Sequence, residues 1–106
     1  MNCIREIPAV RSWHERFKDK GLVVIGNHSP EFELEKSVSN VKKAIARLNV
    51  PYPVVMDNDH VNWRAFNNRF WPTVYLIGKK GIVRYKTIGE GNHARTEEMI
   101  KTLLAE

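Results

Sequence analysis

The stretch Phe70-Trp71-Pro72-Thr73-Val74-Tyr75-Leu76-Ile77 decides how the rest of the chain is arranged. β-Branched and aromatic residues fill its second half, which is the composition of a strand buried on both faces. Proline has no backbone N–H to give to a sheet, so Pro72 has to stand at the strand's first position or at an edge. The paired part of the strand is expected over Thr73–Ile77. Because an aromatic residue precedes Pro72, the peptide bond between Trp71 and Pro72 is also a candidate for the cis isomer.

Three further segments have the pattern of strands. Leu22–Gly26 is a continuous apolar run, typical of a buried parallel strand, and Asn27–Pro30 is expected to close it as a loop. Val54–Met56 is a short strand that follows two prolines. Ile82–Ile88 comes four residues after the Pro72 strand, and the glycines at both ends of that connection predict an antiparallel hairpin.

Apolar residues at three- and four-residue spacing predict helices between these strands. The first runs from Ile4 to Lys20; Gly21 supplies a left-handed cap, and Pro8 either starts this helix or kinks it. A second helix carries one apolar stripe, a short helix covers Val61–Phe66, and the last runs from about Ala94 to Ala105. The helical residues expected in the core are Ile7, Val10, Trp13, Phe17, Leu34, Val38, Val41, Ile45, Leu48, Ile100, Leu103 and Leu104.

The predicted order of elements is αβαβαββα. Strand and helix alternate before a hairpin and a closing helix, which indicates an α/β sandwich with helices flanking a mixed sheet. A chain of 106 residues is long enough for one hydrophobic core and too short for two, so residues 1–106 are expected to form a single domain.

The composition excludes several classes of function. The net charge of +5 raises the possibility of a nucleic-acid binder, but the predicted basic cluster of Lys36, Lys42, Lys43 and Arg47 has no interleaved aromatic residues for stacking on bases. We therefore expect a solvated helix face and no nucleic-acid partner. No apolar run could span a membrane. The four histidines are scattered and there is one cysteine, so we expect surface histidines, no metal and no cofactor.

The residues with the clearest chemistry lie at the beginning of the first predicted helix. Cys3 there would feel the positive end of the helix dipole, which favours the nucleophilic thiolate. Glu6 follows one turn later and could move a proton or hold water. From these residues alone, a small buried cysteine that packs against the first turn explains the pattern at least as well.

The pattern Cys3-x-x-Glu6-x-Pro8 resembles the second half of the active-site segment in thioredoxin-like thiol:disulfide interchange proteins of the TlpA, ResA and DipZ type. The complete pattern there is Trp-Cys-x-x-Cys-x-x-Glu-x-Pro. The resemblance covers essentially the whole chain and is strongest to the C-terminal redoxin domain of DipZ. The other segments that carry it are Trp13–Phe17, Val24–Phe32, Asp57–Asp59, Phe70–Thr73 and Gly89–Gly91.

This resemblance implies a role for each matching residue. Cys3 corresponds to the resolving cysteine, Glu6 to the buried acid beside it, and Pro72 to the cis-proline that faces the sulfur atoms. The backbone at Trp71, with Thr73 on the other side of the proline, would bind an extended segment of a protein substrate. Trp71 has an equally good explanation as a core residue. The resemblance also implies protein thiols and disulfides as partners, and a bacterial, periplasmic or extracytoplasmic location.

The chain departs from the family pattern at its start. The attacking cysteine would precede Cys3 by three residues, where this sequence has none, and the strand that precedes the motif is missing. An intramolecular disulfide needs two sulfur atoms, so whether this chain is an enzyme stays open. We expect a thiol:disulfide oxidoreductase domain that is truncated at its N-terminus and keeps only the resolving cysteine. The alternative is a degenerate, redox-inactive module that binds extended peptides.

The missing strand leads to an expectation about pairing. In the thioredoxin-like arrangement it would lie between Leu22–Gly26 and Thr73–Ile77, and unpaired buried backbone groups there would be costly. We therefore expect these two strands to close up and pair antiparallel, or a second copy of the chain to supply the pairing in a homodimer.

Overall fold

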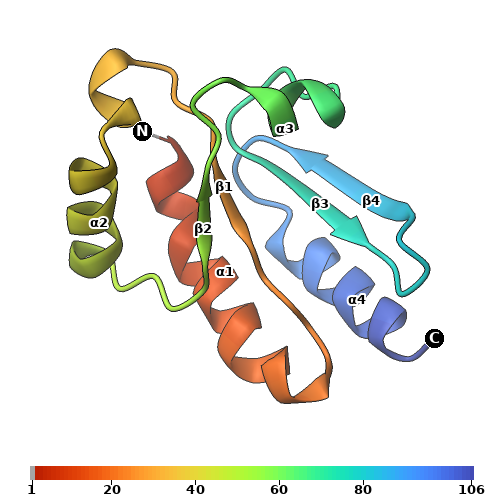
Figure 1. Cartoon of the computed structure of the whole chain (residues 1–106). Helices are drawn as coiled ribbons and strands as arrows, with labels where there is room; N and C mark the ends of the chain where they lie inside the picture. The colour runs from red at the N-terminus through yellow and green to blue at the C-terminus, as the bar shows by residue number, and fades with distance from the viewer. Residues whose placement is uncertain (1) are drawn as a thin grey trace. The chain divides into compact units, whose positions relative to one another are not determined.

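The computed structural model describes the backbone of residues 2–106 and the side chains of residues 4–106. The chain forms two compact units, which we describe separately (Figure 1). The first unit contains the chain up to Val23 and from Phe70 onward, and the second contains Val24–Arg69. A single domain over residues 1–106 stays a prediction.

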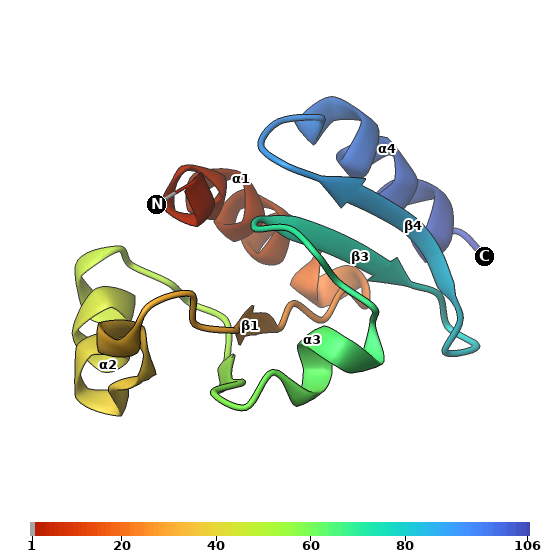
Figure 2. The same ribbon diagram turned by 90° about the horizontal axis from the view of Figure 1, so that it is seen from above.

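The first unit consists of two helices and a β-hairpin. Its elements are α1 (Asn2–Phe17), the 3₁₀ turn η1 (Lys18–Lys20), β3 (Thr73–Ile77), β4 (Val83–Ile88) and α4 (His93–Leu104). β3 and β4 pair antiparallel, with Thr73 opposite Ile88 and a register shift between Leu76 and Ile77. The hairpin and the start of β3 directly after Pro72 are as predicted. Figures 1 and 2 show α4 running along this hairpin.

The first helix ends close to the predicted position. α1 contains Pro8, so this proline lies inside the helix rather than at its start. The chain leaves η1 through Gly21, whose φ of 110° is left-handed and whose N–H bonds the carbonyl of Lys18. A residue with a Cβ would be strained in that conformation, which explains the glycine.

The core of the first unit lies between α1, α4 and β3. Trp13, Phe17 and Ile100 are buried there, and Leu76 of β3 packs against them. Thr96 of α4 is fully buried, and its hydroxyl lies 3.1 Å from that of Tyr85 on β4. The predicted apolar faces of the first and last helices are therefore confirmed at their most buried positions; the other predicted core residues of α1, Ile7 and Val10, are half-buried.

The second unit contains two short parallel strands and three helical segments. Its elements are β1 (Gly26–His28), the 3₁₀ turn η2 (Glu33–Lys36), α2 (Val38–Arg47), β2 (Val54–Met56) and α3 (Val61–Ala65). β1 pairs with β2 in parallel, from Gly26 opposite Val54 to His28 opposite Met56. The bounds of β2 are as predicted, and α3 ends one residue before the predicted Phe66.

The predicted strand Leu22–Gly26 is wrong. Residues 22–25 have no regular structure, and β1 begins at Gly26 and includes Asn27 and His28, which were expected in a loop. The reason lies in the partner strand: Gly26 donates its N–H to the carbonyl of Pro53, and Pro53 has no N–H with which to continue the ladder. Val23 and Ile25 are accordingly exposed.

The single helix predicted after Pro30 is also wrong. The backbone is extended at Ser37, which separates η2 from α2. The Ser37 hydroxyl accepts a hydrogen bond from the N–H of Asn40 at 3.2 Å, which is the arrangement of an N-cap. Leu34 and Val38 fall on either side of this break and are exposed rather than buried, whereas Val41, Ile45 and Leu48 are half-buried.

The strands do not close up in the way that the sequence predicts. Within residues 2–106, β1 pairs with β2 and β3 pairs with β4, so there are two two-stranded sheets instead of one mixed sheet. Antiparallel pairing between Leu22–Gly26 and Thr73–Ile77 is therefore wrong. The homodimer stays a prediction.

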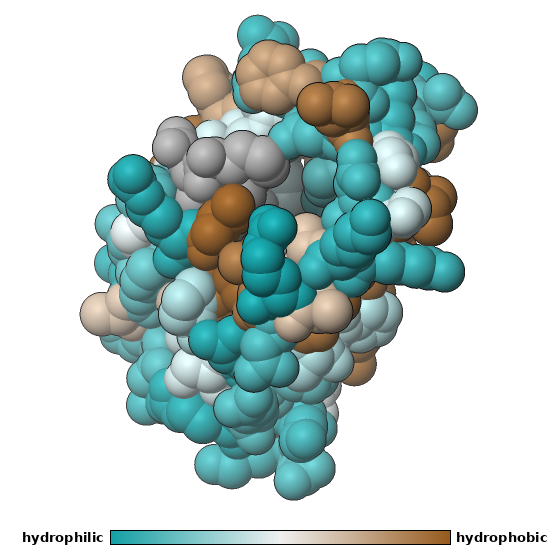
Figure 3. Space-filling view, turned by 90° about the vertical axis from the view of Figure 1, so that its left-hand side faces the viewer, coloured by the Kyte–Doolittle hydropathy of each residue, from teal (hydrophilic) through white to brown (hydrophobic). Residues whose placement is uncertain are grey.

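The face of the molecule drawn in Figure 3 is mostly hydrophilic, with separate apolar patches. On the second unit the exposed apolar side chains include Phe32 and Leu34 of the η2 region. On the first unit they include the outward face of the hairpin, at Ile77, Val83 and Ile88. No helix in the described part of the chain is long and apolar enough to cross a membrane.

Ile100 provides a test of the core. It is 3% exposed, so Ile100→Ala should lower the free energy of unfolding by about 2–5 kcal/mol through lost burial and a residual cavity. Ile88 of β4 is 47% exposed and serves as the matched control, since Ile88→Ala should cost less than about 1 kcal/mol. Urea unfolding of both variants measures the difference. Equal costs would contradict the assignment of the core.

Candidate functional site

The most unusual side chain in the first helix is Glu6, of which only 7% is exposed. Residues three apart on a helix share a face, so Glu6 belongs to the same helical face as Cys3, one turn away. A buried carboxylate is unfavourable without hydrogen-bond donors. Its Oε1 accepts from the N–H of Gly91 at 3.1 Å, and its Oε2 lies 2.8 Å from Nε2 of His93.

Both partners of Glu6 belong to the segment that connects β4 to α4 and includes the first residue of α4, Gly89-Glu90-Gly91-Asn92-His93, which we call the 89–93 loop. The backbone is left-handed at Gly89, Gly91 and Asn92, with φ values of 84°, 98° and 55°. Glycine adopts such values readily, and asparagine does so more easily than most other residues. The side-chain amide of Asn92 donates to the Thr87 hydroxyl at 3.0 Å, which fixes the loop to the end of β4. These turns direct the Gly91 N–H toward Glu6.

A second contact ties the 89–93 loop to Pro72. The N–H of Gly89 donates to the carbonyl of Pro72 at 2.8 Å, and Pro72 is buried. The peptide bond between Trp71 and Pro72 is cis, the isomer expected from the sequence. Directly after it, the Thr73 hydroxyl donates to the carbonyl of Phe70 at 2.6 Å. The loop thus contacts both Glu6 and Pro72, which lie 66 positions apart in the chain.

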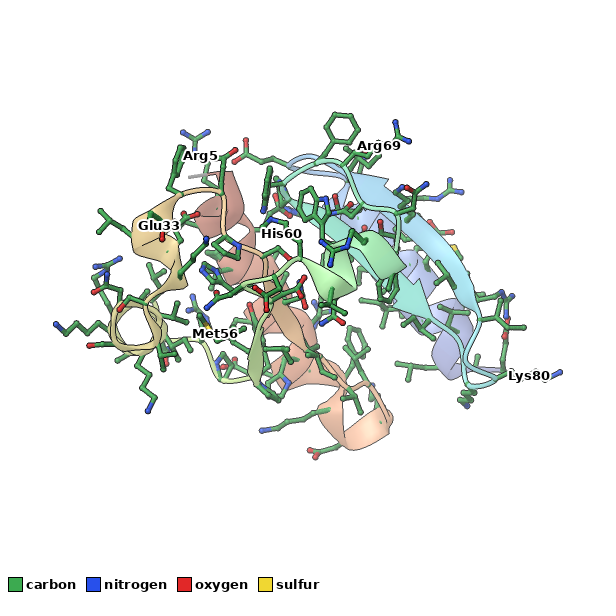
Figure 4. The ribbon with its side chains drawn as sticks, turned by 45° about the horizontal axis from the view of Figure 1, so that its top comes forward. Arg5, Glu33, Met56, His60, Arg69 and Lys80 are labelled. Carbon is green, nitrogen blue, oxygen red and sulfur yellow. The ribbon has the colours of Figure 1, made fainter. Side chains whose placement is uncertain are left out.

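The other predicted site residues are placed as follows. Trp71 and Thr73 flank Pro72 and are both half-buried. Cys3 belongs to α1 by its backbone, and its side chain lies outside the described residues. Arg5, labelled in Figure 4, follows on the same helix and forms a 3.5 Å ion pair with Glu90 of the loop. The roles that the resemblance implies for these residues stay predictions.

Sequence reasoning missed His93. It was expected to be a surface histidine, and 42% of its side chain is indeed exposed, but its Nε2 bonds the buried Glu6 carboxylate. Its ring also packs in a T-shaped arrangement against the ring of Trp13, with 5.9 Å between ring centroids and an interplanar angle of 75°. Glu6 and His93 are 87 residues apart, so no local pattern connects them. The sequence offered only an indirect signal for a role of His93: glycine-rich residues precede it, and the last predicted helix follows it.

The second unit has its own buried acid, Asp57, at the end of β2. It accepts hydrogen bonds from the Ser29 hydroxyl at 2.7 Å and from the N–H groups of Asn62 and Trp63, each at 3.0 Å. Burial raises the pKa of Asp57, but these hydrogen bonds more than offset burial and lower the pKa to about 2. Asp57 therefore joins the end of β1 to the beginning of α3. Met56 and His60, labelled in Figure 4, lie on either side of this acid along the chain.

The predicted basic cluster is distributed over two elements. Lys36 lies in η2 and forms a 3.2 Å ion pair with Glu33, and Lys42, Lys43 and Arg47 are exposed on α2. Among the described residues there is no group of three or more His, Cys, Asp or Glu side chains that could hold a metal ion.

Comparison with known sequences identifies related proteins. The profile of the AhpC/TSA family matches residues 1–86. The protein DipZ of Mycobacterium bovis is 44% identical over 104 residues, which are 98% of this chain and 15% of DipZ. The thiol-disulfide oxidoreductase YkuV of Bacillus subtilis is 27% identical over 104 residues, which are 98% of this chain and 70% of YkuV. This chain therefore spans only a small part of DipZ and most of YkuV.

Comparison with solved structures gives the same fold. The solution structure of a putative thioredoxin from Neisseria meningitidis superposes with a TM-score of 0.87 at 25% sequence identity. The superposition covers 99% of this chain and 67% of that one. The α/β, thioredoxin-like architecture expected from the sequence is thus confirmed, although its strands pair in two separate sheets here.

Asp57 makes a testable contribution to stability. Asp57→Asn replaces an acceptor by an amide that faces donors, so it should lower the free energy of unfolding by about 1.5–3 kcal/mol at neutral pH. Asp59→Asn is the matched control at an exposed position and should cost less than about 0.5 kcal/mol. Urea unfolding at pH 7 measures both.

The pH dependence of stability provides an independent check. The pKa of Asp57 falls from 3.8 to about 2 on folding, so its contribution is complete above the unfolded value and is lost as the pH decreases through that range. Wild type should therefore lose more stability than Asp57→Asn between about pH 4 and about pH 2. Parallel curves for the two proteins would contradict this assignment.

Proposed function

This chain belongs to the AhpC/TSA family of thioredoxin-like proteins, and we propose that it exchanges thiols and disulfides with protein substrates through Cys3. Cys3 is the only sulfur in the chain that can do so, because it is the only cysteine. DipZ, of which this chain spans 15%, and YkuV, which carries thiol-disulfide oxidoreductase in its name, support this choice of chemistry.

The observation that carries the proposal is the arrangement around the 89–93 loop. One loop binds both the buried Glu6, which follows Cys3 by one helical turn, and the carbonyl of Pro72. The thiolate is the reactive form of cysteine, so a nearby carboxylate that accepts the thiol proton assists attack on a disulfide. In this proposal Glu6 accepts that proton and Pro72 borders the place where the sulfur atoms meet.

The reaction with one cysteine ends at a mixed disulfide. The Cys3 thiolate attacks one sulfur of a substrate disulfide, a new S–S bond forms, and the other substrate sulfur leaves as a thiolate. Release then requires a thiol from another molecule, because this chain has no second sulfur that could form an intramolecular disulfide. The expected product is therefore a stoichiometric adduct.

The backbone around Pro72 is the proposed binding site for the substrate. Trp71 and Thr73 flank the cis peptide bond at the beginning of β3. An extended substrate segment that pairs with the backbone at Trp71 would bring its disulfide to Cys3, which is recognition by strand addition. The half-buried ring of Trp71 is available both to the core and to such a segment.

The single cysteine also favours a second candidate function. A redox-inactive module would use the same backbone at Trp71 and Thr73 to bind extended peptides and would not need Cys3. The two functions differ in one property: peptide binding would survive Cys3→Ser, whereas the mixed disulfide would not form.

Mass spectrometry of a mixed disulfide tests the proposed exchange. The reduced protein, incubated with a disulfide-bonded protein such as insulin, should form a covalent adduct at Cys3 that a reductant reverses. Glu6→Gln should slow adduct formation by about tenfold or more, because general acid–base catalysis typically contributes at least that much.

Cys3→Ser is the control for this experiment and should form no adduct. Wild type should show no sustained catalytic turnover of insulin disulfides. Turnover that persists in Cys3→Ser, or adduct formation at the same rate in Glu6→Gln and wild type, would overturn the proposed function.

A further inference from the structure

The side chain of His93 bonds the buried Glu6 carboxylate, so its role follows from how this contact connects the carboxylate to its surroundings. The side chain of Glu6 is 9% exposed to solvent, whereas the side chain of His93 is 42% exposed. A proton that reaches Glu6 therefore has a direct route outward through a group that is itself in contact with solvent. Imidazole is suited to this task because it can accept a proton on one nitrogen while it releases one from the other.

We infer that His93 is a positioning residue that relays protons between the buried Glu6 and solvent during reaction of Cys3, an inference that rests on the proposed function. In the forward direction, the Cys3 thiol gives its proton to the Glu6 carboxylate as the thiolate attacks a disulfide. Glu6 passes this proton to Nε2 of the His93 tautomer that carries its hydrogen on Nδ1, and the imidazole releases the Nδ1 proton to water. Proton exchange with water then restores the starting tautomer. The leaving thiolate takes up a proton from water, so the overall exchange neither gains nor loses protons.

The contacts of Glu6 and His93 define which atoms would exchange the proton. The Gly91 N–H occupies Oε1 of Glu6, which leaves Oε2 to face His93 at 2.8 Å. The imidazole also packs in a T-shaped contact against the ring of the buried Trp13. The Gly91 N–H therefore holds one oxygen of Glu6 in place, and the other oxygen lies within proton-transfer distance of the imidazole.

Other charged groups lie on the same elements, and several of them have partners of their own. They are Arg5, Arg11, His14, Glu15 and Arg16 on α1, Glu90 in the 89–93 loop, and Arg95, Glu97, Glu98 and Lys101 on α4. Arg5 and Glu90 form an ion pair with each other, and Glu97 pairs with Arg16 and Lys101. Glu90 therefore supplies a matched control, since Glu90→Gln removes a charge from the same loop and leaves the contact between Glu6 and His93 in place.

The test follows Cys3 alone. Because the chain has one cysteine, release of thionitrobenzoate from the small disulfide dithiobis(nitrobenzoate) reports that thiol and no other. Stopped-flow rates are measured from about pH 5 to about pH 9, the range in which imidazole and thiol groups ordinarily titrate. The proteins compared are wild type, His93→Gln, His93→Ala, Glu6→Gln and Glu90→Gln, with melting temperatures to confirm folding.

The expected result separates a relay from a purely structural contact. Gln at position 93 can still donate a hydrogen bond to Glu6 but cannot pass a proton on, so His93→Gln should react about tenfold more slowly and lose part of the pH dependence. Added imidazole should restore the rate of His93→Ala and leave Glu6→Gln unchanged. Glu90→Gln should follow wild type throughout.

Two outcomes overturn different claims. If Glu6→Gln is slow but His93→Gln follows wild type at every pH, or imidazole does not restore His93→Ala, the relay is wrong and the proposed exchange stands. If Glu6→Gln itself reacts like wild type, the proposed function fails and the relay fails with it.

Discussion

The candidate site depends on the attachment of one buried carboxylate to one loop. Glu6 is fixed to α1, and its oxygens are bound by Gly91 and His93 of the 89–93 loop. The same loop binds the Pro72 carbonyl through Gly89 and the end of β4 through Asn92. An unpaired carboxylate in this position would cost several kcal/mol, so burial of Glu6 and the loop conformation require each other. The left-handed glycines make that conformation accessible.

The second unit uses a buried acid in a different way. Asp57 accepts hydrogen bonds from Ser29 after β1 and from backbone N–H groups of α3, and these bonds keep it ionised with a lowered pKa. Glu6 instead meets a histidine that reaches solvent. One carboxylate is therefore saturated by fixed donors and serves stability, whereas the other is bonded to a group that can exchange protons. This difference in partners, rather than burial, distinguishes the candidate site from a structural one.

Much of the fold could be predicted where the sequence itself limits the structure. Pro72 determines where β3 begins, Gly21 ends the first helical segment, and the glycines at positions 78 and 81 permit the hairpin. The prediction failed where the start of a strand or helix depends on a hydrogen bond to another residue. β1 begins at Gly26 because Pro53 cannot extend the ladder, and α2 begins after Ser37 because that side chain caps it.

The residues of the candidate site were likewise predicted in part. Glu6 and Pro72 were found because they belong to short motifs that resemble those of a known family, and the cis bond at Pro72 was expected from the same resemblance. His93 was not found, because its contact with Glu6 spans 87 residues and arises only when the 89–93 loop packs against α1. Helical periodicity identifies which residues share one helix face, but it does not identify which distant loop covers that face.

The central claim is that the Glu6 carboxylate assists the reaction of Cys3 by accepting the thiol proton. The rate at which iodoacetamide alkylates Cys3 at neutral pH, followed by mass spectrometry in wild type and in Glu6→Gln, tests this most directly. The reagent attacks through the thiolate, and Cys3 is the only cysteine in the chain. We expect alkylation to be about tenfold slower in Glu6→Gln than in wild type. Equal rates would show that the carboxylate does not assist the thiol, and would contradict the account.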